Sequence, residues 1–471
     1  MARGNGPVLI RNADIWRHGH GDVRWQSGLI TEIGILQPQE GEPVIDAQGG
    51  ALLPGLHDHH IHLSALAVAR ASIPCGPPEV ATSTELATAL DRPGRDWLRG
   101  IGYHESVAGM LDAQTLDRWA PDRPVRIQHR SGRMWFLNSR ALDLILTNAA
   151  APPGLEREHG RWTGRLFDED RWLRQALGST PPSFAEISAD LAAMGVTGLT
   201  DMSPANNGEM AAHFVEEQHH GQLKQQVLLA GTLDLREGRF SDRLMLGPLK
   251  LHLHENALPD LDETIALMRD GHAQCRAIAI HCTTETELVF ALAALDAAGA
   301  CQGDRIEHAG VTPDHLLAEM QRLGLQVVSQ PHFIAQRGDQ YLRDVEPRDH
   351  AFLYRLAAFR RAGVTLAGGS DAPFGSHDPW LAMRAAISRR TREGRLIGED
   401  EALSPEEALQ LFIADPRDLR SERAIAKGSP ADLCLLDRPW AVARSRLQAS
   451  DVRMTIINGS IVYDRVDQPP A

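Results

Sequence analysis

The chain contains very little lysine. Of its 48 basic residues only Lys224, Lys250 and Lys427 are lysines, and all the others are arginines. Arginine keeps its charge in proteins, whereas a buried lysine can lose its proton and react as an amine. A lysine that is retained in a strand of such a chain is therefore a candidate for a chemical role. Lys250, in the strand-like segment 249–254, has this position.

The sequence also lacks paired cysteines, a basic excess and long apolar runs. Its five cysteines form no Cys-x-x-Cys pair, so we expect reduced thiols and no disulfide. The net charge of -14 argues against nucleic acid or an anionic membrane as a partner. No stretch is long enough to span a bilayer, and the first residues lack the apolar core of a secretory signal. We expect a cytoplasmic enzyme with a small-molecule substrate, and the sequence leaves a homo-oligomer open.

The two ends of the chain share a β-rich pattern. The chain of 471 residues is too long for one small core, which suggests two domains or one large barrel with additions. Short strand-like segments separated by turns lie at 8–10, 23–33, 43–53, 432–436 and 453–462. We therefore predict a small β-sandwich domain assembled from residues 1–54 and 425–471. Two unrelated terminal extensions are the alternative.

The middle of the chain alternates short apolar segments with helical stretches such as 287–298 and 313–323. With the segment at His60, this pattern gives eight strands, seven of them at 196–202, 225–231, 249–254, 277–282, 305–308, 326–329 and 364–367. An open doubly wound sheet has a similar alternation, but no Gly-x-Gly-x-x-Gly motif follows any of these strands. The predicted fold class is therefore α/β, with a distorted (β/α)8 TIM barrel formed by residues 55–63 and 191–424.

Residues 64–190 do not follow the rhythm of the barrel. They are rich in Trp, Arg and Pro, and contain strand-like pieces at 97–103 and 125–128 and a Pro/Gly-rich loop at 149–164. We interpret them as an insertion after the first barrel strand, at the face where barrels carry their active sites. Such an insertion would shape substrate access. A structural cap or an oligomer surface are the alternatives.

The segment 53–63 carries a histidine pattern that is typical of a metal site. Asp58, His60 and His62 are spaced two apart, so in an extended strand their side chains lie on one face. Two imidazoles on one face can bind a single ion. A solvated His-rich turn is the alternative for this motif taken alone.

Further polar residues occur at the ends of later strands. Lys250, His281 and His308 are 31 and 27 residues apart (281 minus 250 and 308 minus 281), close to one β/α unit each, and Asp371 follows the last strand. Their side chains should converge at one barrel mouth. Imidazole and carboxylate ligands suit zinc, with manganese, iron or nickel as alternatives. A bound divalent cation lowers the pKa of its water to about 7, which makes hydroxide available at neutral pH.

These motifs, in this order, resemble the amidohydrolase superfamily. The segment Pro54-Gly55 to His62 has the form of its signature. The pieces Arg305-Ile306-Glu307-His308, Gly369-Ser370-Asp371-Ala372-Pro373 and Lys427-Gly428-Ser429-Pro430-Ala431-Asp432-Leu433 follow in the superfamily's order. Within it the chain resembles amidohydrolase family 3, whose members include N-substituted formamide deformylase-like hydrolases. The resemblance covers nearly the whole chain.

The resemblance implies a metal centre of one or two ions. His60 and His62 would bind the more buried metal, and His281 and His308 the second. Asp371 would ligate the first metal and act as the general base.

The resemblance also implies that Lys250 is carboxylated by CO2 and becomes a bridging N6-carboxylysine, which requires an uncharged amine. Some related deacylases bridge their metals with a cysteine, which makes Cys75 an alternative. Candidate substrate-binding residues are Tyr103, His104, Arg133, Trp135 and His332.

The predicted function is hydrolysis of an amide-like C–N bond (N-acyl, N-formyl or cyclic amide) in a small molecule. A metal-activated hydroxide would attack the carbonyl, with Asp371 as general base and then general acid. A mononuclear deaminase or ring-opening hydrolase of a heterocycle is one alternative. A catalytically inactive scaffold is another.

Overall fold

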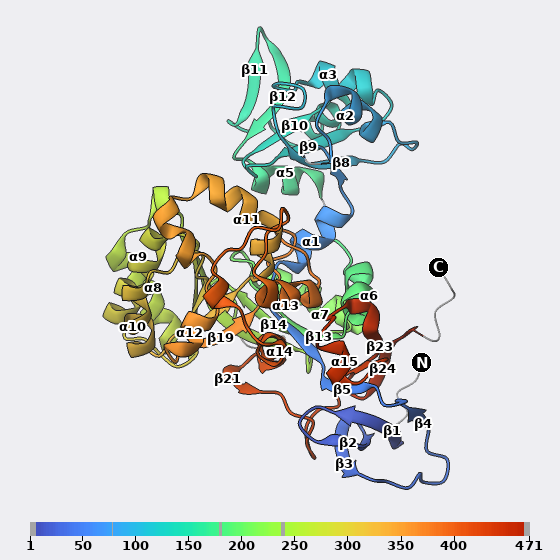
Figure 1. The fold of residues 1–471 in the computed structure, drawn as a ribbon. Coiled ribbons are helices and arrows are strands. Elements are labelled where there is room, and N and C mark those ends of the chain that lie inside the picture. Colours follow the sequence, from blue (N-terminus) through green and yellow to red (C-terminus); the bar gives the residue numbers. More distant parts are fainter. Residues whose placement is uncertain (1–5, 78, 179–180, 237–240, 466–471) are drawn as a thin grey trace. The chain divides into compact units, whose positions relative to one another are not determined.

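The computed structural model describes residues 6–77, 79–178, 181–236 and 241–465. The chain forms two compact units, one of residues 1–63 and 183–471 and the other of residues 64–182. Figure 1 shows the ribbon coloured along the sequence. We describe each unit by itself.

The first unit contains a nearly closed barrel of eight parallel strands. In spatial order the strands are β6 (Leu56–Ile61), β13 (Val196–Asp201), β14 (Gln226–Gly231), β15 (Leu244–His252), β16 (Ile278–Cys282), β17 (Arg305–His308), β18 (Gln326–Ser329) and β19 (Thr365–Gly368). No ladder joins β19 to β6 in the described part of the chain. Instead, the amide of Asp371 donates to the carbonyl of His60 (2.7 Å) and that of His62 to Ala372 (2.9 Å). The predicted fold class and all eight strands are confirmed.

Helices follow the barrel strands and cover the sheet (Figure 1). They are α6 (Ala185–Ala193), α7 (Gly208–His219), α8 (Leu261–Ala273), α9 (Glu285–Ala298), α10 (Asp314–Arg322), α11 (His332–Asp344), α12 (Ala357–Arg361), α13 (Pro379–Ser388), α14 (Pro405–Ile413) and the short 3-10 turns η1 (Glu255–Ala257), η2 (Pro347–Phe352) and η3 (Glu399–Glu401). The predicted helices at 287–298 and 313–323 correspond to α9 and α10. A capping box of Thr284 and Glu287 starts α9, because each side chain accepts a backbone N–H that the first turn leaves unpaired.

Within the described ranges, no helix is both long and apolar enough to cross a bilayer.

Strand β15 differs from its prediction. It begins at Leu244 rather than at residue 249 and ends at His252 rather than at residue 254. The added residues include Gly247-Pro248, and proline cannot donate to a sheet ladder. The register of β14 and β15 shifts at this point, so the strand accommodates the proline as an irregularity. Gly247 is required there, because a Cβ would lie 2.8 Å from the backbone nitrogen of Ala230.

Both ends of the chain contribute strands to one mixed sheet in the first unit, which confirms that they assemble together. Its order is β24 (Ser460–Asp464), β23 (Val452–Ile457), β22 (Leu433–Leu436), β5 (Ala51–Pro54), β1 (Val8–Ile15), β2 (Gly19–Gln26) and β3 (Leu29–Gly34), with β4 (Val44–Asp46) paired to β1. The antiparallel pairing of β22 with β5 joins the two ends, and β5 leads directly into the barrel strand β6. The C-terminal part of the chain also contains β20 (Ala414–Asp415), β21 (Asp418–Glu422), α15 (Trp440–Ala443) and η4 (Ala449–Asp451).

The second unit has a six-stranded sheet of its own. The sheet order is β11 (Leu155–Glu158), β12 (Arg161–Phe167), β10 (Met134–Leu137), β9 (Val125–His129), β8 (Leu98–Tyr103) and β7 (Ile73–Pro74). The helices are α2 (Ser83–Leu90), α3 (Ala113–Trp119), α4 (Ser139–Leu146) and α5 (Asp170–Leu177), and α1 (Leu63–Arg70) connects β6 to this unit along the chain. The predicted strands at 97–103 and 125–128 correspond to β8 and β9.

The prediction of a loop at 149–164 is wrong beyond residue 154, because β11 and β12 form a hairpin there. Its turn residues His159 and Gly160 both have positive φ, the geometry of a two-residue hairpin turn. Leu155 and Leu166 are buried beneath the hairpin. The Arg157 guanidinium lies 4.9 Å from the centre of the Trp162 ring. These contacts order a segment whose prolines and glycines suggested irregular structure.

Candidate metal centre

The first histidine of the site lies on a strand that is buried along its whole length. Strand β6 carries His60, and His62 follows directly after it. The end of β19 approaches β6 so closely that a Cβ on Gly369 would lie 2.5 Å from the Cβ of His60. Glycine at 369 therefore lets the backbone bring Asp371 over the histidine pair.

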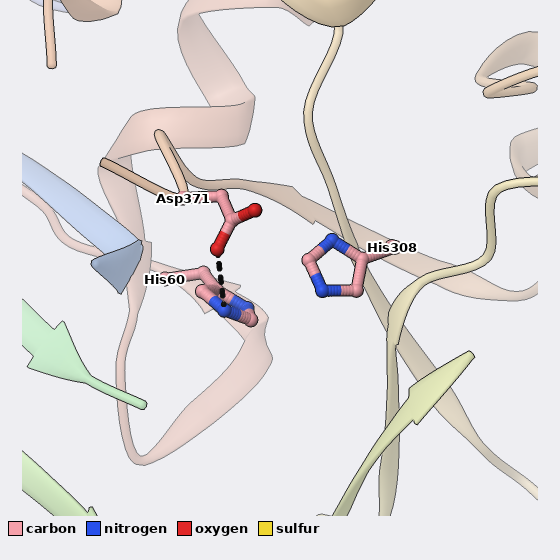
Figure 2. A group of neighbouring side chains, drawn as sticks. All are labelled: His60, His308 and Asp371. Carbon is pink, nitrogen blue, oxygen red and sulfur yellow. Dashed lines mark ion pairs between the residues drawn. The ribbon is translucent and has the colours of Figure 1, made fainter. Parts of the chain in front are cut away.

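His60, His308 and Asp371 form a buried group in which one ligand atom of each lies within 4.8 Å of the others. Figure 2 shows the Asp371 carboxylate directed at the His60 ring, with the His308 ring beside it. Oδ1 of Asp371 lies 3.3 Å from Nε2 of His60 and 3.1 Å from Nε2 of His62. His60, His308 and Asp371 come from the ends of β6, β17 and β19, and the sequence predicted that these strand ends meet.

The outward nitrogens of the two buried histidines are held by acceptors. Nδ1 of His60 lies 2.5 Å from Oε2 of Glu307, and Nδ1 of His308 lies 2.7 Å from Oε1 of Gln330. With Nδ1 donating outward, Nε2 of each ring carries a lone pair. Nε2 of His60 has no hydrogen-bond partner in the described structure although it is buried. A buried ring nitrogen that faces a carboxylate and lacks a hydrogen-bond partner fits a divalent cation.

The charges of the site favour the ligating forms of Asp371 and His308. For His60, burial opposes the charged ring, but Glu307 and Asp371 raise its pKa, so a cation would have to displace a proton there. Burial alone would raise the pKa of the Asp371 carboxyl, but His308, His60 and the hydrogen bond from His62 hold it well below its usual range. Burial lowers the pKa of His308 to about 3, so this ring is neutral at pH 7. Burial also disfavours ionisation of Glu307, yet the Arg305 guanidinium and His60 hold the pKa of its carboxyl well below its usual range. A carboxylate and a neutral imidazole are the forms that bind metal.

His281 and Lys250 lie beside this group. The centre of the His281 ring is 4.5 Å from that of His308 and 4.1 Å from that of His252. Lys250 is buried, and its Nζ has no hydrogen-bond partner in the described structure. Burial lowers the pKa of Lys250 to about 8, so about a tenth of the amine is uncharged at pH 7. An uncharged, unpartnered amine is what carboxylation by CO2 requires.

A cavity of about 440 Å³ opens beside the metal group. It is lined by all six predicted ligands, namely His60, His62, Lys250, His281, His308 and Asp371. A larger cavity of about 920 Å³ is lined instead by residues from the starts of barrel strands, such as Thr197 and Gln226. It includes none of the predicted ligands, so we place the chemistry in the smaller cavity.

The predicted substrate-binding residues lie in varied surroundings. His332, the first residue of α11, is buried; its Nε2 donates to the carbonyl of Ser370 (3.0 Å), and its side chain is not among those that line the smaller cavity. The other four belong to the second unit. Tyr103 donates to the carbonyl of Gly109 (2.6 Å), and Nδ1 of His104 lies 2.7 Å from Oγ of Ser106.

Arg133 and Trp135 also have partners within the second unit. Arg133 forms a bidentate pair with Asp168 (2.7 and 2.8 Å), and Nε1 of Trp135 donates to Asp170 (2.8 Å). Cys75, the alternative bridging ligand, is buried in the core of this unit, and its thiol donates to the carbonyl of Ile73 (3.3 Å). A role of these residues toward substrate or metal stays a prediction.

Two residues that sequence reasoning left without a role are Glu307 and Gln330. Glu307 stands in the quoted motif Arg305-Ile306-Glu307-His308, and Gln330 directly follows β18. A polar residue at a strand end was the signal used for the ligands, and it was present here too. Their partners lie 247 and 22 residues away, which is why the pairing is visible only in the fold.

Solved structures show that a barrel of this kind occurs in metal-dependent hydrolases. An uncharacterised metal-dependent hydrolase from Pyrococcus horikoshii OT3 matches with a TM-score of 0.77 at 19% identity, covering 94% of this chain and 99% of the other. A metal-dependent hydrolase from Pyrococcus furiosus matches with a TM-score of 0.74 at 20% identity, covering 92% and 99%. At these identities the likeness concerns the fold.

The sequence itself matches the amidohydrolase family over residues 43–463. The chain therefore belongs to amidohydrolase family 3, as the motifs predicted. Among curated proteins it is 28% identical to the N-substituted formamide deformylase of Arthrobacter pascens, with 93% of each chain covered.

Proposed function

We propose that this protein is a metal-dependent hydrolase that cleaves an amide-like C–N bond of a small molecule, an N-acyl, N-formyl or cyclic amide. The observation that carries the proposal is the buried group of His60, His308 and Asp371, whose lone pairs converge beside a cavity. The name of the Arthrobacter relative supports a carbonyl–nitrogen bond as the target. Membership of the amidohydrolase family supports the same bond class.

The proposed ligands are those that the family resemblance implies, and all of them line the cavity. We assign His60, His62 and Asp371 to a first ion and His281 and His308 to a second, with zinc as the expected metal. Lys250, carboxylated by CO2, would bridge the two ions. Its buried and unpartnered Nζ supports this assignment.

Asp371 carries the proton transfers. When bound, a divalent cation supplies Lewis acidity, which polarises an amide carbonyl and acidifies a water molecule. The Asp371 carboxylate is ionised at neutral pH and accepts the proton of the attacking water. It then donates that proton to the leaving nitrogen, so that the amine departs neutral. Nε2 of His62 lies 3.1 Å from Oδ1, so both atoms could contact the same ion.

The test of this role is Asp371→Asn, assayed for turnover of N-formyl and N-acyl amines and for metal content. We expect turnover to fall by about 10²- to 10⁴-fold, the usual contribution of a general base, while at least one ion is retained. Asp270→Asn, an exposed aspartate of α8, is the matched control and should leave turnover unchanged. Wild-type turnover in Asp371→Asn would remove Asp371 from the mechanism.

A second candidate function is a mononuclear deaminase or ring-opening hydrolase of a heterocycle. It is favoured by the fact that only three residues, His60, His308 and Asp371, come within ligand distance as one group among the described residues. One ion per chain and deamination of heterocyclic amines would support it. A metal-free protein of unchanged thermal stability and no turnover would instead indicate an inactive scaffold.

A further inference from the structure

One side of the cavity beside the metal group is apolar and aromatic. Phe333, Tyr341, Tyr354 and Phe374 line it, together with aliphatic side chains. The Tyr341 and Tyr354 rings stack at 5.6 Å, and Phe333 packs edge-on against Tyr354 at 5.5 Å. Phe374 is 57% exposed. A wall of this kind favours a substrate with an aryl or branched alkyl group.

A single arginine stands in this wall. Arg337 of α11 lies with its guanidinium 4.3 Å from the centre of the Phe333 ring, and it donates to the carbonyl of Phe374. In the part of the chain that the structure describes, no carboxylate lies within 4.0 Å of this guanidinium, whereas arginines elsewhere in the barrel, such as Arg355, pair with acids. Arg337 also hydrogen-bonds to the Tyr341 hydroxyl. Because a guanidinium has five N–H donors, donors remain for a ligand.

The arginine and the metal group are joined through one loop. Phe374, whose carbonyl accepts from Arg337, donates its own amide to the carbonyl of Asp371 (2.8 Å). The Phe374 ring packs edge-on against His62 at 5.8 Å. The Arg337 guanidinium therefore lines the same cavity as the candidate metal ligands. A ligand that fills the cavity would contact both Arg337 and the metal group.

We propose that Arg337 binds a carboxylate of the substrate, so that the preferred substrates are N-acyl or N-formyl amines that carry both an apolar side group and a carboxylate. This inference rests on the proposed function for the bond that is cleaved. The carboxylate would accept two parallel N–H donors of the guanidinium, while the apolar group packs on the aromatic wall.

The first experiment compares two substrates that differ only in the carboxylate, N-formylphenylalanine (both enantiomers) and N-formylphenethylamine. In the wild type we expect kcat/KM to be about tenfold to hundredfold higher for the better enantiomer of the acid, the range of a charge-assisted hydrogen-bond pair. Arg337→Met should abolish this preference, mainly through a higher KM for the acid. Arg337→Lys, which keeps the charge, should restore part of it.

Arg343→Met is the matched control, since Arg343 is an exposed arginine in the last turn of the same helix and does not line the cavity. It should keep the wild-type preference. Equal kcat/KM for acid and neutral substrate in the wild type would overturn the proposal. A preference that survives in Arg337→Met would overturn it as well. Either result leaves amide hydrolysis itself intact.

The second experiment does not depend on turnover. Calorimetry compares the binding of 3-phenylpropanoate and 3-phenylpropan-1-ol to the metal-loaded protein. We expect the acid to bind about tenfold more tightly in the wild type and in Arg343→Met but not in Arg337→Met. If no amide is hydrolysed while this pattern holds, the proposed function fails and the carboxylate subsite stands. If the acid binds equally well to Arg337→Met, the subsite is refuted.

Discussion

Replacing Glu307 by glutamine is expected to lower both the stability of the barrel and its affinity for a divalent cation. Oε1 of Glu307 lies 2.6 Å from Nε of Arg305, Oε2 lies 2.5 Å from Nδ1 of His60, and all three side chains are at most 3% exposed. Glutamine keeps the shape but not the charge. It therefore leaves the Arg305 guanidinium buried without its counter-ion.

The magnitude follows from this burial. Removing one partner of a buried ion pair costs about 3–5 kcal/mol. Because the amide oxygen of the introduced glutamine still accepts one hydrogen bond, we expect the free energy of unfolding to fall by about 3 kcal/mol. The loss should appear in metal-stripped protein, since it does not depend on the cation. Weaker orientation of His60 should in addition raise the metal dissociation constant by about 10- to 100-fold.

Urea unfolding of metal-stripped protein measures the first effect, and competition with a chromogenic chelator measures the second. Glu319→Gln is the control, because Glu319 pairs with Arg322 on the exposed face of α10 and should change neither quantity measurably. If Glu307→Gln unfolds at the same urea concentration as Glu319→Gln, the buried pair does not stabilise the barrel as argued. If metal affinity is also unchanged, Glu307 does not orient His60.

Three further predictions concern other parts of the chain. Gln330→Leu removes the acceptor of His308 Nδ1 and should weaken metal binding by about 10- to 100-fold in the chelator assay, whereas Gln330→Glu, which keeps an acceptor, should not. Glu42→Gln removes a buried partner of Arg24 (2.6 Å) and should lower the free energy of unfolding by about 1–3 kcal/mol at pH 7. The hydrogen bonds from Arg24 hold the pKa of the Glu42 carboxyl below its usual range, so the difference from wild type should be constant above about pH 5 and shrink as pH falls below the unfolded value of about 4.3; a gap that widens in acid would contradict this. Cys75→Ser should leave the metal content unchanged by elemental analysis, and loss of an ion would restore Cys75 as a ligand.

The barrel could be predicted because its strands have a simple signature. Each is a short apolar run that is buried on both faces, and polar residues follow where the strand ends. The start of β15 escaped this reasoning because Gly247-Pro248 breaks the apolar run, while the sheet absorbs the proline through a shift in register. The hairpin of β11 and β12 escaped it because His159-Gly160 and the prolines before it are typical of loops.

The candidate ligands could be proposed from strand ends and family motifs, but the groups that hold them could not. Glu307 orients His60 across 247 residues of sequence, and Gln330 orients His308 from the neighbouring strand. Spacing along the chain does not specify which polar side chains meet inside a barrel, because this depends on register and on the close approach of β19 to β6. Arg337 was missed for a related reason: it lies on a helix, and only the fold turns it toward the cavity.

Elemental analysis of protein purified without chelator tests the metal centre most directly, with His308→Ala measured beside the wild type. We predict one or two divalent ions per wild-type chain, and fewer in the variant, together with amide hydrolysis that a chelator abolishes and added zinc restores. Two ions and the added mass of one CO2 on Lys250 would support the bridged centre. A wild-type protein without a stoichiometric divalent ion that still hydrolyses amides in the presence of chelator would contradict the assignment of His60, His308 and Asp371 as metal ligands.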